Sequence, residues 1–188
     1  MADVRAFVAM LLDVATRAVL GAAVERLRRV ARHVAWVAPG KLHLTLKFLG
    51  NVDQARVEEI VAALRGAAAG VAAFEAAVRG LGAFPTPTRP RVIWAGVSEG
   101  ADTMVELAGR VDTALAILGF PREARPFSPH VTLGRVRVPR RDPALAEALA
   151  GGEGREFGRV RVGRVALMQS RLSPKGSEYT ELAGVPLR

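Results

Sequence analysis

Apolar and polar residues follow two kinds of pattern along this chain. Short runs in which they alternate, or which are wholly apolar and bounded by Gly, Pro or Asn, predict β-strands. Stretches in which apolar residues recur every three or four positions predict helices. Strands are predicted at residues 4–10, 34–37, 42–49, 74–79, 91–97, 130–138, 155–162, 165–171 and 177–182. Helices are predicted at 13–32, from 53 through 64, at 101–118 and at 142–151.

Helix caps and turn residues separate these elements. Asp13, Asp53 and Asp142 stand where an N-cap is expected, and Pro143 follows the last of them at the first helical position. Gly50 is expected to end the strand at 42–49. The prolines at 85, 87 and 90 indicate a loop between the two halves of the chain, and residues 173–176 read as a turn.

The order of these elements mixes strands and helices, and short turns join many of the strands. That combination predicts an α+β fold with mainly antiparallel sheet rather than a doubly wound parallel one. We interpret residues 1–188 as a single domain made of two related, pseudo-symmetric lobes, with the helices on the outside. Each lobe contributes one central strand to a cleft between the lobes.

The interpretation as two lobes depends on a tetrad that occurs twice. His43-Leu44-Thr45-Leu46 and His130-Val131-Thr132-Leu133 both read His-x-Thr-x with apolar residues at x. Successive side chains of a strand point to opposite faces, so each copy presents one imidazole and one hydroxyl on the same face. The chain has only three histidines, and the second tetrad follows the first by nearly half the chain length.

Composition limits the class of protein and the compartment in which we expect it. The chain has 188 residues, half of them hydrophobic, which is enough to bury a core. It has no cysteine, so disulfides and cysteine-bound metals are excluded. No apolar run approaches the ~20 residues that span a membrane, and the short run at 7–12 lies between two aspartates. We expect a cytoplasmic monomer that does not bind membranes.

The formal charge of +9 comes almost entirely from arginine and favours a polyanionic partner, nucleic acid first. The alternative is a coding bias toward arginine with a solvated basic surface. No carboxylate stands at metal-ligand spacing from the two tetrads, and neither a Gly-rich phosphate loop nor a GxSxG motif is present. We expect no metal and no cofactor.

With these motifs the chain resembles the 2H phosphoesterases, which carry two His-x-Thr-x motifs, and among them the RNA 2′,3′-cyclic phosphodiesterases, once called 2′–5′ RNA ligases. The resemblance extends almost end to end. It includes the segments at residues 5–9, 36–37, 42–50, 90–94, 125–135, 167–176 and 179–180. It implies a bilobal α+β fold whose cleft is lined by both motifs, without a metal.

The chemistry of this family fits the residues. Opening a cyclic phosphate needs one group to take a proton from water and another to protonate the leaving ribose oxygen, and two imidazoles suit both tasks. The residues alone do not show which histidine does which. The family pattern implies that His43 is the proton donor and His130 the acceptor, with a 2′-phosphate as product. Thr45 and Thr132 are expected to donate to the non-bridging phosphate oxygens.

Four further residues are expected to contact the substrate. Strict alternation places Lys47 on the face of His43, and Arg135 follows the second tetrad, where it could bind the phosphate with two hydrogen bonds. Phe7 and Phe127 are candidates for stacking on a base. Alternation assigns Phe48 to the core, together with Trp36 and Trp94. His33 has no threonine partner and ends a helix, so a structural role is expected.

The substrate implied is an RNA with a 2′,3′-cyclic phosphate end, tRNA fragments included, and formation of 2′–5′ RNA bonds is a possible side activity. One alternative is the hydrolysis of another cyclic phosphate, such as that of ADP-ribose. The other is an RNA-binding module without catalysis, although intact His and Thr at both motifs argue against it.

Overall fold

The computed structural model describes residues 3–174 and 176–188, so Lys175 of the predicted turn lies outside the described residues. Its strands are β1 (Asp3–Leu11), β2 (Val34–Trp36), β3 (His43–Asp53), β4 (Phe74–Phe84), β5 (Val92–Val97), β6 (His130–Val136), β7 (Glu156–Val162), β8 (Arg164–Ser173) and β9 (Gly176–Pro186). Its helices are α1 (Val14–Val30), α2 (Val57–Ala68), α3 (Ala101–Ile117) and α4 (Pro143–Ala150), with short 3₁₀ turns η1 (Pro39–Lys41) and η2 (Gln54–Arg56).

Two of the three predicted caps start the helices expected of them, whereas Asp53 caps the turn η2 and α2 begins only at Val57, after Arg56. The Asp13 side chain accepts a hydrogen bond from the Thr16 amide at 2.6 Å and starts α1. Asp142 accepts from the Leu145 amide at 3.0 Å and starts α4, with proline at the first helical position. Each cap satisfies an amide that has no partner inside its helix, which fixes where the chain turns from extended to helical.

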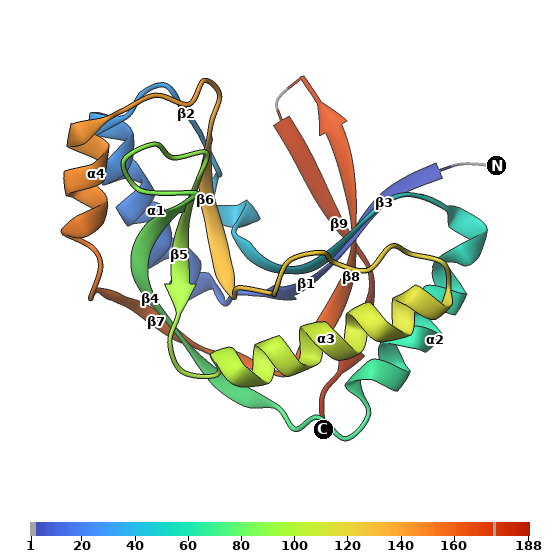
Figure 1. Ribbon diagram of the computed structural model, residues 1–188. Coiled ribbons are helices and arrows are strands. Elements are labelled where there is room, and N and C mark those ends of the chain that lie inside the picture. Colours follow the sequence, from blue (N-terminus) through green and yellow to red (C-terminus); the bar gives the residue numbers. More distant parts are fainter. Residues whose placement is uncertain (1–2, 175) are drawn as a thin grey trace.

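The strands form one curled antiparallel sheet in the order β7-β4-β5-β6-β3-β1-β8-β9, with β2 paired to the far end of β6. The sheet has two halves, one of four strands and one of four plus β2, which meet where β6 and β3 pair through Leu44 and Val131. Figure 1 shows the two halves as the arms of a strongly curved sheet. The α+β class, the antiparallel pairing and the central position of both His-x-Thr strands are confirmed.

The helices cover the outside of the sheet, but two of them cross between its halves. Helix α1 follows β1 of one half and packs on β7 and α4 of the other. Helix α3 follows β5 and packs on α2 and β3 across the junction. Most buried apolar residues of both halves join in one cluster, while Phe7, Ala9, Ala166 and Met168 form a second, smaller one. The two related halves are therefore interleaved in the sequence, and each lacks part of its cover without the other.

Several boundaries differ from the sequence interpretation, and two differences change the layout of the sheet. Strand β3 continues through Gly50 to Asp53, because its pairing with β1 runs on to Asp3. The proline-containing loop after Phe84 joins β4 to β5, which are neighbours in one half, so it does not separate the halves.

Candidate active site

The two His-x-Thr motifs lie side by side on β3 and β6. Leu44 and Val131 are cross-strand partners and both are buried. The residues that flank them therefore share the opposite, concave face, where antiparallel pairing places each histidine across from the threonine of the other motif. Histidines that are far apart in the sequence thus belong to one cluster of two imidazoles and two hydroxyls.

His43 is held by its own backbone and by aromatic rings. Its Nδ1 lies 2.7 Å from the carbonyl oxygen of Lys41, so Nδ1 carries the proton and donates it. Nε2 then accepts from the Thr45 hydroxyl at 3.1 Å. The rings of Phe7 and Tyr179 lie 4.9 and 5.2 Å from the imidazole. Burial lowers the pKa of His43, and the bond to the Lys41 carbonyl opposes that shift only in part.

His130 is held in the same way in the other half. Its Nδ1 lies 2.7 Å from the carbonyl oxygen of Ser128, again two residues earlier in the chain. The ring of Phe84 stands edge-on at 5.1 Å. Burial lowers the pKa of His130; the Ser128 carbonyl raises it and the nearby Arg135 guanidinium lowers it further. In both histidines Nδ1 is fixed by a carbonyl, which leaves Nε2 as the nitrogen that can exchange a proton with a substrate.

The alternation that places both motifs fails directly after each of them. The pairing of β1 with β3 shifts between Ala9, opposite Thr45, and Val8, opposite Lys47, so one residue of β3 is extra. The pairing of β5 with β6 shifts in the same way between Thr132 and Gly134. These are β-bulges, which reverse the faces of the residues that follow.

The expectation that Lys47 faces the phosphate is wrong for this reason. The bulge places Lys47 on the helix side of the sheet, where 3 % of the residue is exposed. Its Nζ donates to Asp112 of α3 and to the carbonyl oxygen of Pro121, both at 2.6 Å. Lys47 therefore ties β3 to α3 and does not contribute a cation to the concave face.

The residues after the two bulged positions face the site instead. Phe48, expected in the core, is 60 % exposed, and its ring lies 6.1 Å from that of Phe7. Arg135 stands at the equivalent position of β6, is exposed, and lies close enough to His130 to affect its pKa. The Arg135 guanidinium is thus within electrostatic range of His130, its contact with the phosphate stays a prediction, and Phe48 is a further residue on this face.

Of the two phenylalanines expected to stack on a base, Phe7 is not open to one, and stacking by Phe127 stays a prediction. Phe7 touches the His43 ring but is 3 % exposed, so it backs the imidazole. Phe127 is partly buried and packs on the main core. Tyr179 and Phe84 line the histidines and were missed as site residues. The alternation of 177–182 is the signal that points to Tyr179. The pairing of β4 with β5 points to Phe84, but that pairing is not visible in the sequence.

Beside His130 lies a hollow of about 570 Å³ whose floor includes Trp94. Trp94 was expected in the core, but it is only partly buried and its indole packs over Gly82 of β4 and Gly96 of β5. A Cβ on Gly82 would come within 2.3 Å of this ring, so only glycine allows the contact. In the part of the chain that the structure describes, the buried Trp94 Nε1 has no hydrogen-bond partner. Trp36 does pack on the core, and its Nε1 donates to the Ala31 carbonyl at 3.1 Å.

His33 lies outside this cluster. Its Nδ1 is 3.0 Å from Arg140 and its Nε2 is 3.6 Å from Asp142, which caps α4. That position agrees with the structural role expected from the sequence. Among the described residues no three His, Cys, Asp or Glu side chains gather as metal ligands. None of the described helices combines the length and apolar character that crossing a bilayer requires.

Comparison with known proteins identifies the family. Residues 16–173 match the model of the 2′-5′ RNA ligase superfamily. An RNA 2′,3′-cyclic phosphodiesterase of Methanothermobacter thermautotrophicus is 37% identical over 179 residues, which cover 95% of this chain and 96% of that protein. One of Thermus thermophilus is 35% identical over 190 residues, with 98% and 90% covered.

Solved structures agree. TT0787 of Thermus thermophilus superimposes with a TM-score of 0.81 at 32% identity, with 98% of each chain covered. Escherichia coli LigT, solved with 3′-AMP, gives a TM-score of 0.76 over 99% of each chain, and at 24% identity it supports the fold alone. The match of most of the chain to the family model, with these relatives, confirms the resemblance seen in the motifs: the chain belongs to the 2′-5′ RNA ligase superfamily.

Proposed function

We propose that this protein hydrolyses 2′,3′-cyclic phosphate ends of RNA to 2′-phosphomonoesters, with His43 and His130 as the acid and the base. The observation that carries the proposal is the pair of imidazoles on one concave face, each with Nδ1 fixed by a carbonyl and Nε2 left for proton exchange. Relatives named RNA 2′,3′-cyclic phosphodiesterase support the substrate class.

The proton transfers balance as follows. Nε2 of His130 takes a proton from water while the water oxygen attacks phosphorus in line with the 3′ oxygen. The bond between phosphorus and the 3′ oxygen breaks, and the His43 imidazolium gives its Nε2 proton to that oxygen. The products are a 2′-phosphate and a free 3′ hydroxyl, and exchange with solvent restores both histidines. Positioned acid and base groups each contribute roughly 10²–10⁴ in rate.

The remaining side chains act on the phosphate. Thr45 donates to His43 Nε2 in the free protein. Once His43 is protonated, Nε2 no longer accepts, so the Thr45 hydroxyl is released to donate to a non-bridging oxygen. Thr132 occupies the corresponding place on β6, and Arg135 supplies a fixed positive charge. The phosphate anion in turn favours the charged form of His43, whose pKa burial lowers in the free protein.

Hydrolysis of cytidine 2′,3′-cyclic phosphate by His43→Ala, His130→Ala and the double variant tests this proposal. Each single change should lower kcat/KM by about 10²–10⁴, and the double variant should be little worse, because both groups act on one transition state. His33→Ala is the matched control and should retain wild-type turnover. Phosphorus NMR should show the 2′-phosphate as product, and saturating EDTA should leave the rate unchanged.

Several results would refute the proposal. A 3′-phosphate product would reverse the leaving oxygen, and loss of turnover in EDTA with recovery in a divalent ion would refute the two-histidine mechanism. Faster turnover of an ADP-ribose cyclic phosphate than of cyclic-ended RNA would show that the proposed substrate is wrong.

Formation of 2′–5′ bonds from a 2′,3′-cyclic end and a 5′ hydroxyl is measured in the same samples as a side activity. We further propose that the protein acts as a cytoplasmic monomer, and sedimentation tests its oligomeric state.

A further inference from the structure

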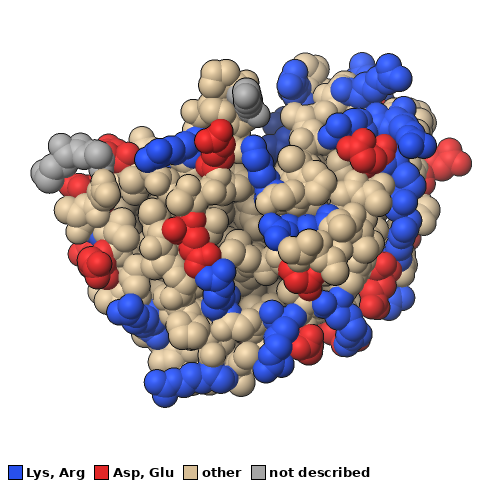
Figure 2. All heavy atoms as spheres, turned by 180° about the vertical axis from the view of Figure 1, so that it is seen from behind, with Lys and Arg blue, Asp and Glu red and all other residues tan. Residues whose placement is uncertain are grey.

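Two basic segments of the sequence are brought together at the outer end of β6. Residues 26–41 contain five Lys or Arg residues and no Asp or Glu, and residues 135–141 contain four arginines and no acidic residue. Strand β2 of the first segment pairs with the end of β6, with Ala35 opposite Arg135 and Val34 opposite Val136. Figure 2 shows Lys and Arg side chains gathered along the edge of the half that carries α1 and α4.

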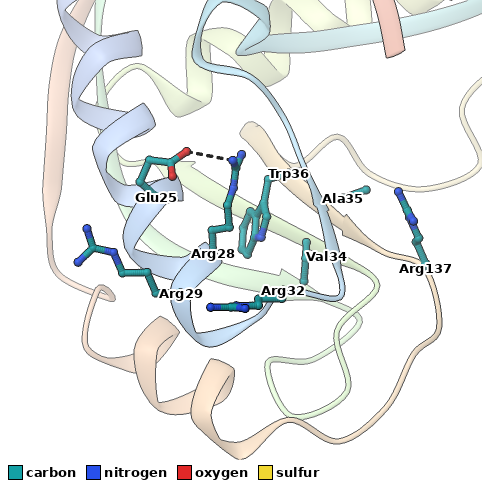
Figure 3. A pocket seen from close by; sticks show the side chains of 8 residues that line it. All are labelled: Glu25, Arg28, Arg29, Arg32, Val34, Ala35, Trp36 and Arg137. Carbon is teal, nitrogen blue, oxygen red and sulfur yellow. Dashed lines mark ion pairs between the residues drawn. The ribbon is translucent and has the colours of Figure 1, made fainter. Parts of the chain in front are cut away.

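A pocket of about 560 Å³ lies at this edge, between the end of α1 and β2 (Figure 3). Arg28, Arg29 and Arg32 line it from the α1 side, Trp36 from β2 and Arg137 from the residue after β6. We call this feature the arginine pocket. It has the side chains that bind phosphate in fork-like pairs of hydrogen bonds, beside an aromatic ring.

Three of the four arginines have no acidic partner. Arg28 pairs with Glu25 at 3.4 Å. Within the described residues, Arg29, Arg32 and Arg137 form no ion pair and no side-chain hydrogen bond. Cations in the last turn of a helix are favoured by the helix dipole, which accounts for Arg29. It does not account for Arg32 or Arg137, which lie outside the helix, so the cations that line the pocket on the two sides of β2 are left uncompensated.

A line of exposed cations connects the arginine pocket with the catalytic histidines. Arg135 and Arg137 are both exposed and separated by the buried Val136, so they share one face of the chain at the end of β6. Arg135 stands five residues after His130 on β6, and its guanidinium is near enough to lower the pKa of that histidine. At about 3.3 Å per residue, His130 and Arg137 are on the order of 20 Å apart along the strand. A strand of RNA whose end reaches the histidines can therefore follow β6 to the pocket.

We propose that the arginine pocket is a second binding site for the RNA substrate, where phosphates upstream of the cyclic end contact Arg29, Arg32 and Arg137. This proposal rests on the proposed function and adds to it a preference for an RNA strand over a cyclic mononucleotide. A cyclic mononucleotide reaches only the histidines, whereas an RNA strand also gains the release of counterions from the phosphates held in the pocket.

The test compares Arg29→Ala/Arg32→Ala/Arg137→Ala with Arg65→Ala/Arg110→Ala/Arg161→Ala. The second triple variant removes the same charge elsewhere, and Arg65 matches Arg29 in lying in the last turn of a helix. Binding is measured by fluorescence anisotropy with an RNA of about ten nucleotides ending in a linear 3′-phosphate, across a salt series. Three lost phosphate contacts should make the slope of log affinity against log salt shallower by about 2.

Turnover gives the second readout. The pocket variant should hydrolyse cytidine 2′,3′-cyclic phosphate like the wild type and lose at least tenfold in kcat/KM on a cyclic-ended oligonucleotide. The control variant should change kcat/KM on both substrates by the same small amount. It should also leave the slope of log affinity against log salt nearly unchanged. Thermal denaturation checks that both variants fold.

Three outcomes would overturn the proposal. Equal losses on mononucleotide and oligonucleotide would place the arginines in the catalytic machinery. Unchanged RNA binding would assign the pocket to another anion, such as an acidic peptide, which a polyglutamate competitor detects. Equal effects of the two triple variants would mean that only net charge matters. Failure of the wild type to hydrolyse any cyclic phosphate refutes the proposed function instead, and the binding series still reports on the pocket.

Discussion

Replacing Lys47 by Met separates a structural role from a catalytic one. Met keeps the length of the side chain but removes the ammonium group. The Lys47 side chain is 2 % exposed, and its Nζ donates to Asp112 and to the Pro121 carbonyl, both at 2.6 Å. The change leaves the Asp112 carboxylate, whose side chain is 17 % exposed, without its closest cation.

The structure sets the size of the effect. Breaking a buried ion pair from one side costs about 3–5 kcal/mol. Asp112 keeps part of its solvent contact and Arg122 at 4.0 Å, so we expect the low end, about 3 kcal/mol. In a domain of this size each kcal/mol lowers Tm by about 2–4 °C, which gives a fall of about 6–12 °C. Turnover of cytidine 2′,3′-cyclic phosphate by the folded variant should stay within a few-fold of wild type.

The loss of stability in Lys47→Met should depend on pH in a definite direction. Burial alone would raise the pKa of Asp112, but the hydrogen bond from Lys47, with the Glu123 amide and Arg122, lowers it overall. A lowered carboxyl pKa stabilises the folded protein above the unfolded value of about 3.9, and the gain is lost as pH falls through the folded pKa. The Tm gap between wild type and Lys47→Met should therefore be full at neutral pH and narrow below about pH 4.

Thermal denaturation from pH 3 to 8, together with kcat/KM at pH 7, provides the assay. Lys47→Met/Asp112→Ala should be less destabilised than the sum of the single changes, since each removes the same pair. Arg65→Met is the exposed control. A loss of 10² or more in kcat/KM with an unchanged Tm would show that Lys47 serves the substrate and that the bulge is misread.

Three further predictions concern the histidines. Because the pKa values of both are lowered, kcat/KM should follow a bell whose maximum lies below about pH 6.5, and a maximum above pH 7.5 would contradict this. Lowered histidine pKa values let the unfolded chain bind more protons below about pH 6.5, so His43→Ala/His130→Ala should lose less Tm than wild type between pH 7 and 5. In Arg135→Met, NMR titration should show a higher pKa for the His130 imidazole and an unchanged pKa for His43. Equal shifts of the two pKa values would mean that Arg135 does not act on His130 in particular.

The sequence predicts this fold as far as its local patterns reach. Caps such as Asp13 and Asp142, and the alternation within each His-x-Thr tetrad, depend on neighbours in the chain, and both are recovered. The faces of Lys47 and Phe48 depend on a bulge, which is defined by the register between β3 and β1. No local pattern encodes that register, so strict alternation assigns both side chains to the wrong face.

The interleaving of the halves is hidden for a similar reason. A helical pattern shows that α1 has an apolar stripe but not which half of the sheet the stripe covers. Its packing on β7 joins residues 14–30 to residues 156–162. Likewise the contacts of His130 with Phe84, and of His43 with Tyr179, follow from strand order. The residues proposed to carry the chemistry are visible in the motifs, whereas those that shape their surroundings are not.

The bulges also supply a reason for the two histidines to differ. Both halves repeat the same backbone sequence of events, a His-x-Thr tetrad, a bulge, and then a side chain on the concave face. That side chain is the apolar Phe48 in one half and the cationic Arg135 in the other. Burial lowers the pKa of each histidine, and among the described residues a guanidinium lowers the pKa further at His130 but not at His43. A cation disfavours the imidazolium, so it favours the neutral form that a base needs. The pseudo-symmetric fold therefore supports the proposed assignment of His130 as base and His43 as acid, a distinction that two equivalent motifs do not make by themselves.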